Sequence, residues 1–498
     1  MTAELFIDTR RVTGLRSPRI YGHFLEHFHR QVYGGIYDPK SPFADSDGLR
    51  EDVISAIRAI DPAVIRWPGG CFVSGYHWQD GIGPDRRPRF DKAWRVEDSN
   101  EFGTDEFVNF CRRVNAEPYI CTNAGTGTSE EMADWVEYCN LTEHGRWARL
   151  RAQNGHPQPH GVKYWSIGNE NYGDWEIGAK SATEWGRFVK ESAKMMKAVD
   201  PSIELMAASV AELDWNINLL REAGQYLNWI SIHGYWDALW EVNNLSSYET
   251  CMAHSTRIGD QIETTEHILG ALGLLGRVRI AFDEWNLRGW HHPKRWSATE
   301  DFLTPRDKND DNSTYTMADA VFNACFLNEC LRHCNTVGMA NFAPLVNTRG
   351  AIFTYPEGIV LRSTYFVFAL YTRHMGDVVL DSWVSGEPGF TVSMPEGDQT
   401  VAAIDAVATR TSGRHDLRIA LVNRHPEDEM VISIHSNQIQ EFSNATLHQL
   451  RGPSRDAYND VDSPNRVGVH SDSFRLSGES HTMLHLPPHS ASVLVLSD

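Results

Sequence analysis

Two carboxyl-bearing motifs each follow a short apolar run. Asn169-Glu170 follows the run WSIG, and Asp283-Glu284 follows the run RIAF. A third carboxylate, Glu26, ends the segment RIYGHFLE. Two carboxyl groups that face each other can cleave a glycosidic bond, because one protonates the leaving group while the other attacks the sugar or activates water. A buried pair of like charges also separates its own pKa values, which supplies one acid and one base.

The adjacent pair Asp283 and Glu284 raises a question of orientation. Side chains alternate between the two faces of a strand. We therefore expect only one of the two carboxylates to face the site and the other to be structural.

Strand-sized apolar runs alternate with helix-sized segments over the first three quarters of the chain. Because the runs are short and mostly continuous in apolar residues, they indicate strands buried on both faces, and eight of them predict a (β/α)8 barrel. A doubly wound sheet is the alternative, but the chain lacks the G-x-G-x-x-G fingerprint. The predicted strands are residues 19–26, 64–70, 117–123, 164–170, 203–209, 229–235, 278–285 and 336–345. The predicted helices are residues 47–60, 104–115, 129–138, 182–198, 253–275 and 317–333, with Thr104, Ser129 and Ser181 as capping residues of three of them.

The pattern changes near residue 376, where alternating runs separated by turn residues predict an antiparallel β-sandwich. We expect residues 17–375 to form the barrel. Residues 1–16, which also resemble a strand, are expected to join residues 376–498 in a jelly-roll-like accessory domain, since chain termini often lie close together. The predicted sandwich strands are residues 390–394, 401–408, 417–423, 430–436 and 490–496.

Composition excludes several classes of partner. The 498 residues carry a net charge of −20, so neither nucleic acid nor an anionic membrane surface is an expected partner. No run of 18 apolar residues or signal-peptide pattern is present, which predicts a cytoplasmic protein. The eight cysteines are then expected to be reduced thiols.

Other motifs favour structural interpretations. His23-x-x-Glu26-His27 matches an inverted zinc-peptidase signature, but its surroundings predict a strand and loop rather than the helix that such a site needs. Cys330 to Cys334 fits buried thiols better than a metal site. Residues 125–129 predict a tight turn before a capped helix. Three tryptophans near the Glu284 motif are assigned equally to packing and to substrate contact: Trp285, Trp290 and Trp296.

The ordered set of motifs resembles glycoside hydrolase family 51. The matching segments are YGHFLEHFHRQVYGGIYD (21–38), RWPGG (66–70), residues 103–140, WSIGNE (165–170), FDEWN (282–286) and MANFAPLVN (339–347). The resemblance implies a retaining, exo-acting α-L-arabinofuranosidase that needs no metal or other cofactor and is a homohexamer. It implies Glu170 as general acid/base and Glu284 as nucleophile. The remaining positions that it implies for sugar binding or orientation are Glu26, Cys71, Trp94, Asn169, His233 and Tyr235.

Two positions depart from the family pattern. Cys71 stands where the family usually has Asn, and Pro344 stands where it usually has Gln. A buried sugar hydroxyl without its partner costs about 1–3 kcal/mol. Either another residue replaces the lost amides, or the substrate is a different sugar, such as a galactofuranoside, β-xyloside or glucan. A non-catalytic carbohydrate-binding barrel is a third hypothesis. The expected partner is a furanoside-containing oligosaccharide or polysaccharide, and a cytoplasmic location favours short imported oligosaccharides.

Overall fold

Eight parallel strands form one sheet in the computed structural model, which describes residues 2–237, 245–289, 310–386, 388–478 and 481–498. The strand order is β8-β7-β6-β3-β2-β11-β10-β9, and a bridge between Ala208 and Ser231 joins the two edges into a ring. The prediction of a (β/α)8 barrel is confirmed. The barrel strands are β2 (Gly22–Phe24), β3 (Val64–Trp67), β6 (Glu117–Thr122), β7 (Tyr164–Ile167), β8 (Glu204–Ala207), β9 (Trp229–Asp237), β10 (Arg279–Arg288) and β11 (Val337–Phe342).

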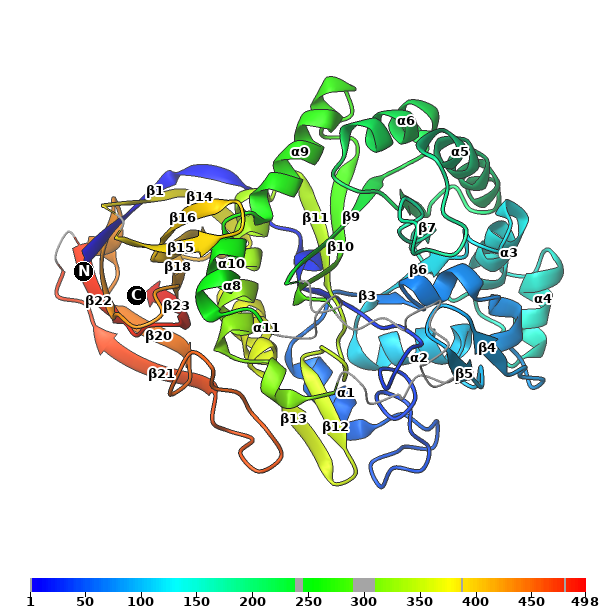
Figure 1. The fold of residues 1–498 in the computed structure, drawn as a ribbon, viewed down its shortest axis with the longest axis horizontal. Coiled ribbons are helices and arrows are strands. Elements are labelled where there is room, and N and C mark those ends of the chain that lie inside the picture. The colour runs from blue at the N-terminus through cyan, green and yellow to red at the C-terminus, as the bar shows by residue number, and fades with distance from the viewer. Residues whose placement is uncertain (1, 238–244, 290–309, 387, 479–480) are drawn as a thin grey trace.

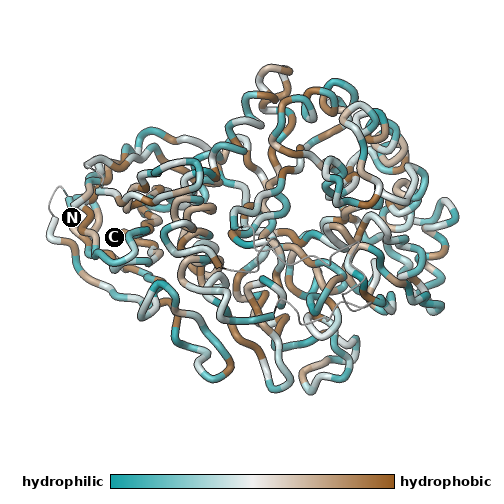
Figure 2. Tube along the Cα trace, viewed as in Figure 1, coloured by the Kyte–Doolittle hydropathy of each residue, from teal (hydrophilic) through white to brown (hydrophobic). Residues whose placement is uncertain are grey.

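The barrel strands are buried on both faces, as their continuous apolar composition predicted. Every residue of β3, β7 and β11 is buried. Figure 2 shows apolar segments along the inner strands and hydrophilic residues on many outer turns. The strands therefore form a rigid ring, and the loops that connect them can present polar catalytic residues.

Helices follow most of the strands and surround the barrel in Figure 1. They are α1 (Glu51–Ala59), α2 (Thr104–Val114), α3 (Ser129–Asn140), α4 (Arg146–Gln153), α5 (Ala182–Val199), α6 (Leu213–Ala223), α8 (Tyr248–Ser255), α9 (Ile258–Ala271), α10 (Met317–Arg332) and α11 (Ser363–His374). Short 3-10 helices are η1 (Pro18–Tyr21), η2 (Cys71–Gly75), η3 (Trp78–Gly81), η4 (Asn312–Thr314) and η5 (Ile439–Glu441), and two hairpins pair β4 (Arg89–Asp91) with β5 (Val96–Asp98) and β12 (Ile352–Tyr355) with β13 (Gly358–Leu361).

The predicted helix boundaries are partly wrong. Ser181 caps α5 as expected, but Thr104 and Ser129 are the first residues of their helices, and the caps are Gly103 and Thr128. The Thr128 hydroxyl accepts from the Glu131 N–H. The single helix predicted over 253–275 is instead two helices, because the chain leaves the helix between α8 and α9.

A second sheet contains nine strands in the order β21-β20-β23-β18-β17-β14-β1-β19-β22. Its pairs are antiparallel except β1 with β19, which is parallel. One apolar core receives side chains from strands across this sheet, including Leu5, Ile419 and Leu494. The strands are β1 (Thr2–Leu15), β14 (Val378–Ser385), β17 (Ile404–Arg410), β18 (Asp416–Asn423), β19 (Met430–Ser436), β20 (Asn444–Arg451), β21 (Gly468–Arg475), β22 (His481–Leu486) and β23 (Ser490–Ser497).

The run at 390–394 is not part of this sheet. It forms β15 (Gly389–Met394), which pairs with β16 (Gly397–Ala402) in a separate hairpin. The predicted strand 401–408 spans the end of β16 and most of β17. Alternating sequence alone does not distinguish a hairpin from a strand of the main sheet, because both have the same period of two.

Helices α10 and α11 lie between the barrel and the nine-stranded sheet (Figure 1). The Asn328 amide of α10 donates to Asp405 of β17 at 2.9 Å, and Tyr371 of α11 donates to Asn328 at 2.8 Å. These buried bonds link α11 to α10 and α10 to the second sheet.

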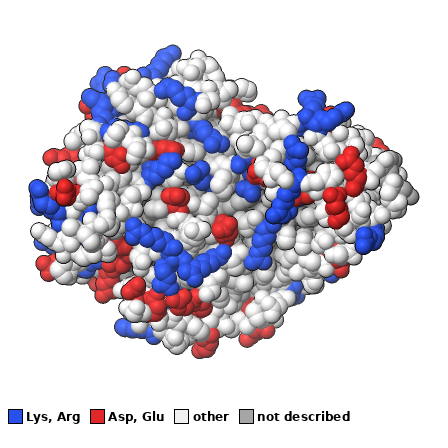
Figure 3. Space-filling view, turned by 180° about the vertical axis from the view of Figure 1, so that it is seen from behind, with Lys and Arg blue, Asp and Glu red and all other residues white. Residues whose placement is uncertain are grey.

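On the face drawn in Figure 3, lysine and arginine side chains are interspersed with aspartate and glutamate. Within the described ranges, no helix is both long and apolar enough to cross a bilayer.

The N-terminal strand provides a test of the second sheet. Leu5 of β1 is fully buried in its core, so we expect Leu5→Ala to lower the free energy of unfolding by about 2–5 kcal/mol. The neighbouring Glu4 is exposed, and Glu4→Ala should change it by less than about 1 kcal/mol. Thermal and denaturant unfolding measure both effects. Equal stability losses in the two variants would contradict the assignment of Leu5 to the core.

Candidate active site

Glu170 and Glu284 meet at the mouth of the barrel. Glu170 follows β7 and Glu284 lies on β10. One oxygen of each carboxylate and a ring nitrogen of His233 all lie within 4.8 Å of one another. The Glu284 side chain is 4% exposed and that of Glu170 is 13% exposed. The two carboxylates therefore share one largely enclosed space, with Glu170 closer to solvent.

The Arg66 guanidinium, on β3, links the two halves of this site. Its Nη1 donates to Glu284 Oε2 at 2.7 Å, and its Nη2 donates to Asn169 Oδ1 at 2.6 Å. Burial opposes the Arg66 charge, but the charges of Asp283 and Glu284 outweigh burial and hold the pKa of Arg66 well above its usual value. A permanent buried cation thus stabilises the acidic end of β10.

Both carboxylates of the Asp283-Glu284 pair face the barrel interior, so the expectation that only one of them does so is wrong. Asp283 nevertheless has the structural surroundings that were expected of one member of the pair. The pairing of β10 with β9 shifts register between Ala281 and Glu284. Such an irregularity turns consecutive side chains to one side. Asp283 lies deeper and accepts from Ser231 at 2.6 Å, and it also accepts from the Tyr119 hydroxyl.

Asp283 stays ionised in this position. Burial raises its pKa, but Arg66 and His233 outweigh burial and lower the pKa of Asp283 to about 2. Its side chain is fully buried. Asp283 therefore supplies a fixed negative charge below the two carboxylates at the mouth.

His233 and Tyr235 of β9 contact the two carboxylates directly. The Tyr235 hydroxyl donates to Glu284 Oε1 at 2.7 Å. His233 Nδ1 lies 2.9 Å from Glu170 Oε1 and 3.7 Å from Glu284 Oε2. Burial lowers the pKa of His233, but Glu284, Asp283 and Glu170 outweigh burial and raise it to about 10. His233 is therefore a second cation between the acidic groups.

A strained turn presents Glu170. Its φ is 44°, a left-handed conformation that is uncommon for glutamate. Gly168 precedes it at φ 71°, where a Cβ would overlap Asn171 and Trp185. Tyr172 donates to Glu170 Oε1 at 3.2 Å, and the Trp175 indole donates to Oε2 at 2.8 Å. Both carboxylate oxygens are thus oriented by neighbours in the same loop.

Glu26 lies behind the two glycines of the Pro-Gly-Gly motif. A Cβ on Gly69 or Gly70 would come within about 3 Å of the Glu26 carboxylate, which explains the need for glycine. The Phe72 N–H and the Trp94 indole each donate to Glu26 Oε1 at 2.9 Å. Burial and the Glu284 charge raise the pKa of Glu26 well above its usual value. Glu26 Oε2 is buried without a hydrogen-bond partner among the described residues.

Glu176 is a further buried carboxyl that the sequence did not single out. Its Oε2 accepts from the Asn169 amide at 3.2 Å, and carboxylate oxygens of Glu176 and Glu170 lie within 4.8 Å of each other and of Cys71 Sγ. Burial and the Glu170 charge raise the pKa of Glu176 to about 7. Burial, followed by these carboxylates, also raises the pKa of Cys71 well above its usual value. Burial therefore favours the protonated form of both groups beside the mouth.

The structure brings together all the site residues that the sequence predicted: Glu26, Cys71, Trp94, Asn169, Glu170, His233, Tyr235 and Glu284. Trp94 is 1% exposed and stacks on Phe28 with ring centroids 4.0 Å apart, so it reaches this group through Glu26. Pro344 is also buried, in the loop after β11.

Sequence reasoning did not assign a role to Arg66, Tyr172, Trp175 or Glu176. Arg66 lies inside the quoted RWPGG motif, and the other three lie within six residues of Glu170. For Tyr172, Trp175 and Glu176, the signal that the sequence offered was their proximity to the Asn169-Glu170 motif. The turn after β7 brings Tyr172, Trp175 and Glu176 back toward Glu170.

Trp285, a candidate for substrate contact, and Asn123, which follows β6, both have structural roles. Trp285 is fully buried and stacks on Phe326 with ring centroids 3.6 Å apart. Asn123 Oδ1 accepts from three successive backbone N–H groups at residues 125–127, which confirms the tight turn before α3. Trp290 and Trp296 lie outside the described residues.

The two sequence motifs that resemble metal sites, at residues 23–27 and 330–334, have the structural settings that the sequence analysis favoured. His23 lies on β2 and His27 on the loop after it, so the predicted strand and loop are confirmed in place of a helix. His27 Nδ1 contacts Asp98 Oδ2 at 2.9 Å. Cys330 and Cys334 are buried free thiols.

Metal-compatible spacing does occur at the mouth itself. Within the described ranges, the groups close enough to hold an ion are Cys71 with Glu170 and Glu176, and Glu170 with His233 and Glu284. Each group contains Glu170, and its members already have partners in the protein. A metal ion bound by either group would therefore compete with the present hydrogen-bond partners of Glu170 for its carboxylate oxygens.

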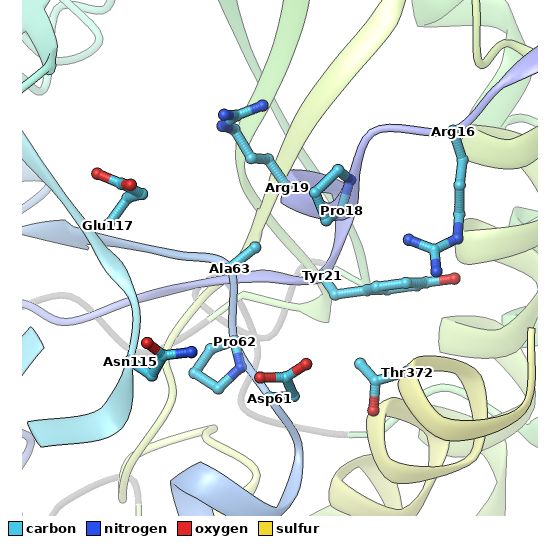
Figure 4. Close-up of a pocket in the computed structure, with 10 residues that line it drawn as sticks. All are labelled: Arg16, Pro18, Arg19, Tyr21, Asp61, Pro62, Ala63, Asn115, Glu117 and Thr372. Atoms are coloured by element: carbon cyan, nitrogen blue, oxygen red, sulfur yellow. The ribbon is translucent and has the colours of Figure 1, made fainter. Parts of the chain in front are cut away.

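A polar pocket at the opposite end of the barrel is separate from this site. Figure 4 shows it between Arg16, Tyr21, Asp61 and Glu117. Asp61 precedes β3 and Glu117 begins β6. Active sites of (β/α)8 barrels form at the carboxyl ends of the strands, so this pocket is not the candidate site.

A closed parallel barrel with two adjacent carboxylates at its mouth, flanked by cationic and phenolic groups, defines a glycoside hydrolase. Residues 56–253 match the α-L-arabinofuranosidase 1 domain, and residues 283–490 match the α-L-arabinofuranosidase C-terminal domain. The chain belongs to the α-L-arabinofuranosidases of glycoside hydrolase family 51.

Individual relatives match along nearly the whole chain. An intracellular exo-α-(1→5)-L-arabinofuranosidase 1 of Bacillus subtilis is 34% identical over 99% of this chain and 99% of that protein. An intracellular exo-α-(1→5)-L-arabinofuranosidase of Halalkalibacterium halodurans is 33% identical over 86% of each chain. The crystal structure of a Thermotoga maritima α-L-arabinofuranosidase in complex with arabinose superposes with a TM-score of 0.89, at 34% identity over 99% of both chains.

Glu176 gives a pH-dependent test of the site. Its folded-state pKa of about 7 exceeds the ordinary glutamate value near 4.5. The folded protein therefore binds more protons than the unfolded chain between these values, and raising the pH through this range destabilises the fold, by up to about 1.4 kcal/mol per unit of pKa difference. Because glutamine stays neutral, Glu176→Gln should gain stability relative to the parent as the pH rises from 5 to 8.

Thermal unfolding at both pH values measures this difference. The exposed Glu130 provides a control, and Glu130→Gln should keep a constant offset from the parent. A constant offset for Glu176→Gln as well would contradict the buried, proton-binding environment of Glu176.

Proposed function

We propose that the protein is an exo-acting, retaining α-L-arabinofuranosidase that releases terminal arabinofuranosyl residues by double displacement. The observation that carries the proposal is the approach of Glu170 and Glu284, whose nearest oxygens lie within 4.8 Å. Retaining enzymes hold their carboxyl groups about 5–5.5 Å apart, whereas inverting enzymes leave about 6.5–9.5 Å for a water molecule. The short separation favours direct attack by one carboxylate.

Glu284 is the nucleophile in this mechanism. Arg66 and Tyr235 each donate to a different oxygen of its carboxylate at 2.7 Å. These bonds hold both oxygens of the carboxylate in place at the mouth. Glu284 attacks the anomeric carbon as the bond to the glycosidic oxygen breaks, and Glu170 transfers its proton to that oxygen.

The charge balance of the site supports Glu170 as the acid. Two cations, Arg66 and His233, face three carboxylates, Asp283, Glu284 and Glu170. These five side chains carry a net charge of −1, so one bound proton makes the set neutral. Asp283 and Glu284 contact Arg66, while Glu170 is the most exposed carboxylate of the three. Glu170 is thus the one best placed to exchange a proton with a leaving group or with water.

The second displacement reverses these roles. Glu170, now ionised, takes a proton from water, and the resulting hydroxide attacks the anomeric carbon. The ester bond to Glu284 breaks, Glu284 regains its negative charge, and arabinose leaves with its original configuration. Two inversions at one carbon give net retention.

We assign Glu26, Cys71, Trp94, Asn169, His233 and Tyr235 to the sugar pocket. Glu26 Oε2 is a buried acceptor or donor without a partner among the described residues, which suits a sugar hydroxyl. Glu176 adds a carboxyl beside Cys71, where the family's usual amide is missing. This supports compensation for the lost amide, and the arabinofuranosidase names of the relatives favour arabinose over a galactofuranoside, xyloside or glucan.

We further propose that the enzyme acts inside the cell on short oligosaccharides, in line with the intracellular naming of its relatives. Residues 17–375 would form the catalytic unit, with residues 1–16 and 376–498 as its accessory domain. Family resemblance supports a homohexamer without a metal or other cofactor.

Two substitutions test the assigned roles. Glu284→Gln should lower kcat by at least about 1000-fold on every substrate, because it removes the nucleophile. Glu170→Ala should abolish turnover of arabino-oligosaccharides but retain cleavage of a dinitrophenyl α-L-arabinofuranoside, whose leaving group needs no proton. Azide should restore turnover of the latter variant and yield a glycosyl azide of retained configuration, which proton NMR identifies.

Asp174→Asn is a matched control, since Asp174 is an exposed carboxylate in the same loop, and its activity should equal that of the parent. A panel of nitrophenyl glycosides assayed with the parent enzyme tests the sugar. Activity confined to a different glycoside would overturn the arabinose assignment. Binding without hydrolysis of any glycoside would favour a non-catalytic carbohydrate-binding barrel.

A further inference from the structure

We propose that Cys71, Glu170 and Glu176 form an inhibitory binding site for a thiophilic divalent cation, for which Zn²⁺ is the probe. This inference rests on the proposed function, because it takes Glu170 as the catalytic acid that a bound ion would withdraw from the reaction. It concerns control of the activity and adds no metal to the catalytic steps.

The three side chains each offer one ligand atom at a spacing that suits a single ion. Cys71 Sγ and one carboxylate oxygen from each of Glu170 and Glu176 all lie within 4.8 Å of one another. The ligand atoms of a tetrahedral Zn²⁺ site lie roughly 3.5 Å apart, since its bonds to sulfur and oxygen are about 2.0–2.3 Å long. Small side-chain movements would therefore close the site, and water could take the fourth position.

The Glu176 carboxyl is incompletely bonded in this group. Glu176 is 4% exposed, and its Oε2 accepts from the Asn169 amide at 3.2 Å. Its Oε1 is buried without a hydrogen-bond partner among the described residues, and Cys71 and Ser74 are polar neighbours of the carboxyl. A buried oxygen without a partner is costly. An ion shared with the Cys71 sulfur would satisfy it.

The backbone holds the ligands in place around this space. Cys71 is 5% exposed at the start of η2, directly after β3 and the two glycines of the Pro-Gly-Gly motif. Glu170 and Glu176 come from the turn after β7, where the Glu176 N–H donates to the Gly173 carbonyl at 2.9 Å. Glu170 is the most exposed of the three ligands. An ion can therefore enter from the Glu170 side.

The second group with metal-compatible spacing, Glu170 with His233 and Glu284, is less suited to a cation. Arg66 Nη1 donates to Glu284 Oε2 at 2.7 Å and lies 3.5 Å from His233 Nε2. An ion held by this group would meet the guanidinium charge at close range. The group that contains Cys71 has a thiol in place of these contacts, and thiolate ligands select Zn²⁺ over Mg²⁺.

Binding at this site would remove the catalytic acid. The ion replaces the thiol proton of Cys71 and any proton on Glu176, these protons pass to solvent, and no group changes its oxidation state. Glu170 then gives an electron pair to the ion and cannot protonate the glycosidic oxygen. Because Tyr172 and Trp175 already donate to the Glu170 carboxylate, the ion must displace or weaken these bonds, so we expect reversible binding.

Inhibition by Zn²⁺ tests the site in enzyme without a polyhistidine tag. Zn²⁺ should slow hydrolysis of nitrophenyl α-L-arabinofuranoside, and a chelator should restore the rate. We expect Cys71→Ser and Glu176→Gln each to raise the Zn²⁺ inhibition constant at least about 10-fold. Each variant is compared with its own rate in the absence of Zn²⁺. Mg²⁺ should leave the parent rate unchanged, because it binds thiolate poorly.

Cys334→Ser is the matched control, because Cys334 is a buried free thiol that precedes β11 at the opposite end of the barrel. It should keep the inhibition constant of the parent. Co²⁺ gives a measurement that does not depend on activity. A thiolate-to-Co²⁺ charge-transfer band should appear in the near ultraviolet with the parent and with Cys334→Ser, and it should be absent with Cys71→Ser.

Circular dichroism and thermal unfolding check that all three variants fold. An unchanged inhibition constant in Cys71→Ser or in Glu176→Gln would overturn the proposal, as would a parent without the Co²⁺ band. A parent enzyme inactive on the arabinofuranoside would instead refute the proposed function, and the Co²⁺ band would still decide whether the cation site exists.

Discussion

The burial of Arg66 among acidic groups is the interaction on which the site depends. Carboxylates taken out of water are costly unless a fixed positive charge and hydrogen bonds compensate. Arg66 is 1% exposed and contacts Asp283, Glu284 and Asn169, which come from two other strand ends. A single guanidinium thus brings the acid loop and the nucleophile strand together, and its planar fork sets the angle between them.

Much of the fold was predictable because burial leaves a strong pattern. The barrel strands are mostly apolar runs, since both of their faces are covered, and the strand pattern identified β1, β17, β18, β19 and β23 of the second sheet. The failures have local causes. The register shift between Ala281 and Glu284 leaves no signature in sequence, so strict alternation wrongly turned one of Asp283 and Glu284 away from the barrel interior. The break between α8 and α9 and the separate β15–β16 hairpin likewise depend on tertiary packing.

The site was predictable to the extent that its residues belong to short motifs. Glu170 and Glu284 were identified because each follows an apolar strand and carries a distinctive neighbour. Trp175 and Glu176 were missed because their roles arise from a turn that returns the chain to Glu170. The left-handed φ of Glu170, at 44°, shows that this turn is held against local preference. Its geometry follows from packing around Gly168 and Gly173, which the sequence presents only as isolated glycines.

The central claim is that the Glu284 carboxylate becomes covalently bonded to the sugar. Glu170→Gln mixed with a dinitrophenyl α-L-arabinofuranoside should form this ester faster than it breaks down, since the first step then needs no acid and the second lacks its base. Mass spectrometry of the quenched protein, followed by peptide mapping, should find one added anhydropentose unit on the peptide that contains Glu284. An adduct on another residue, or turnover to arabinose of inverted configuration without any adduct, would contradict the account.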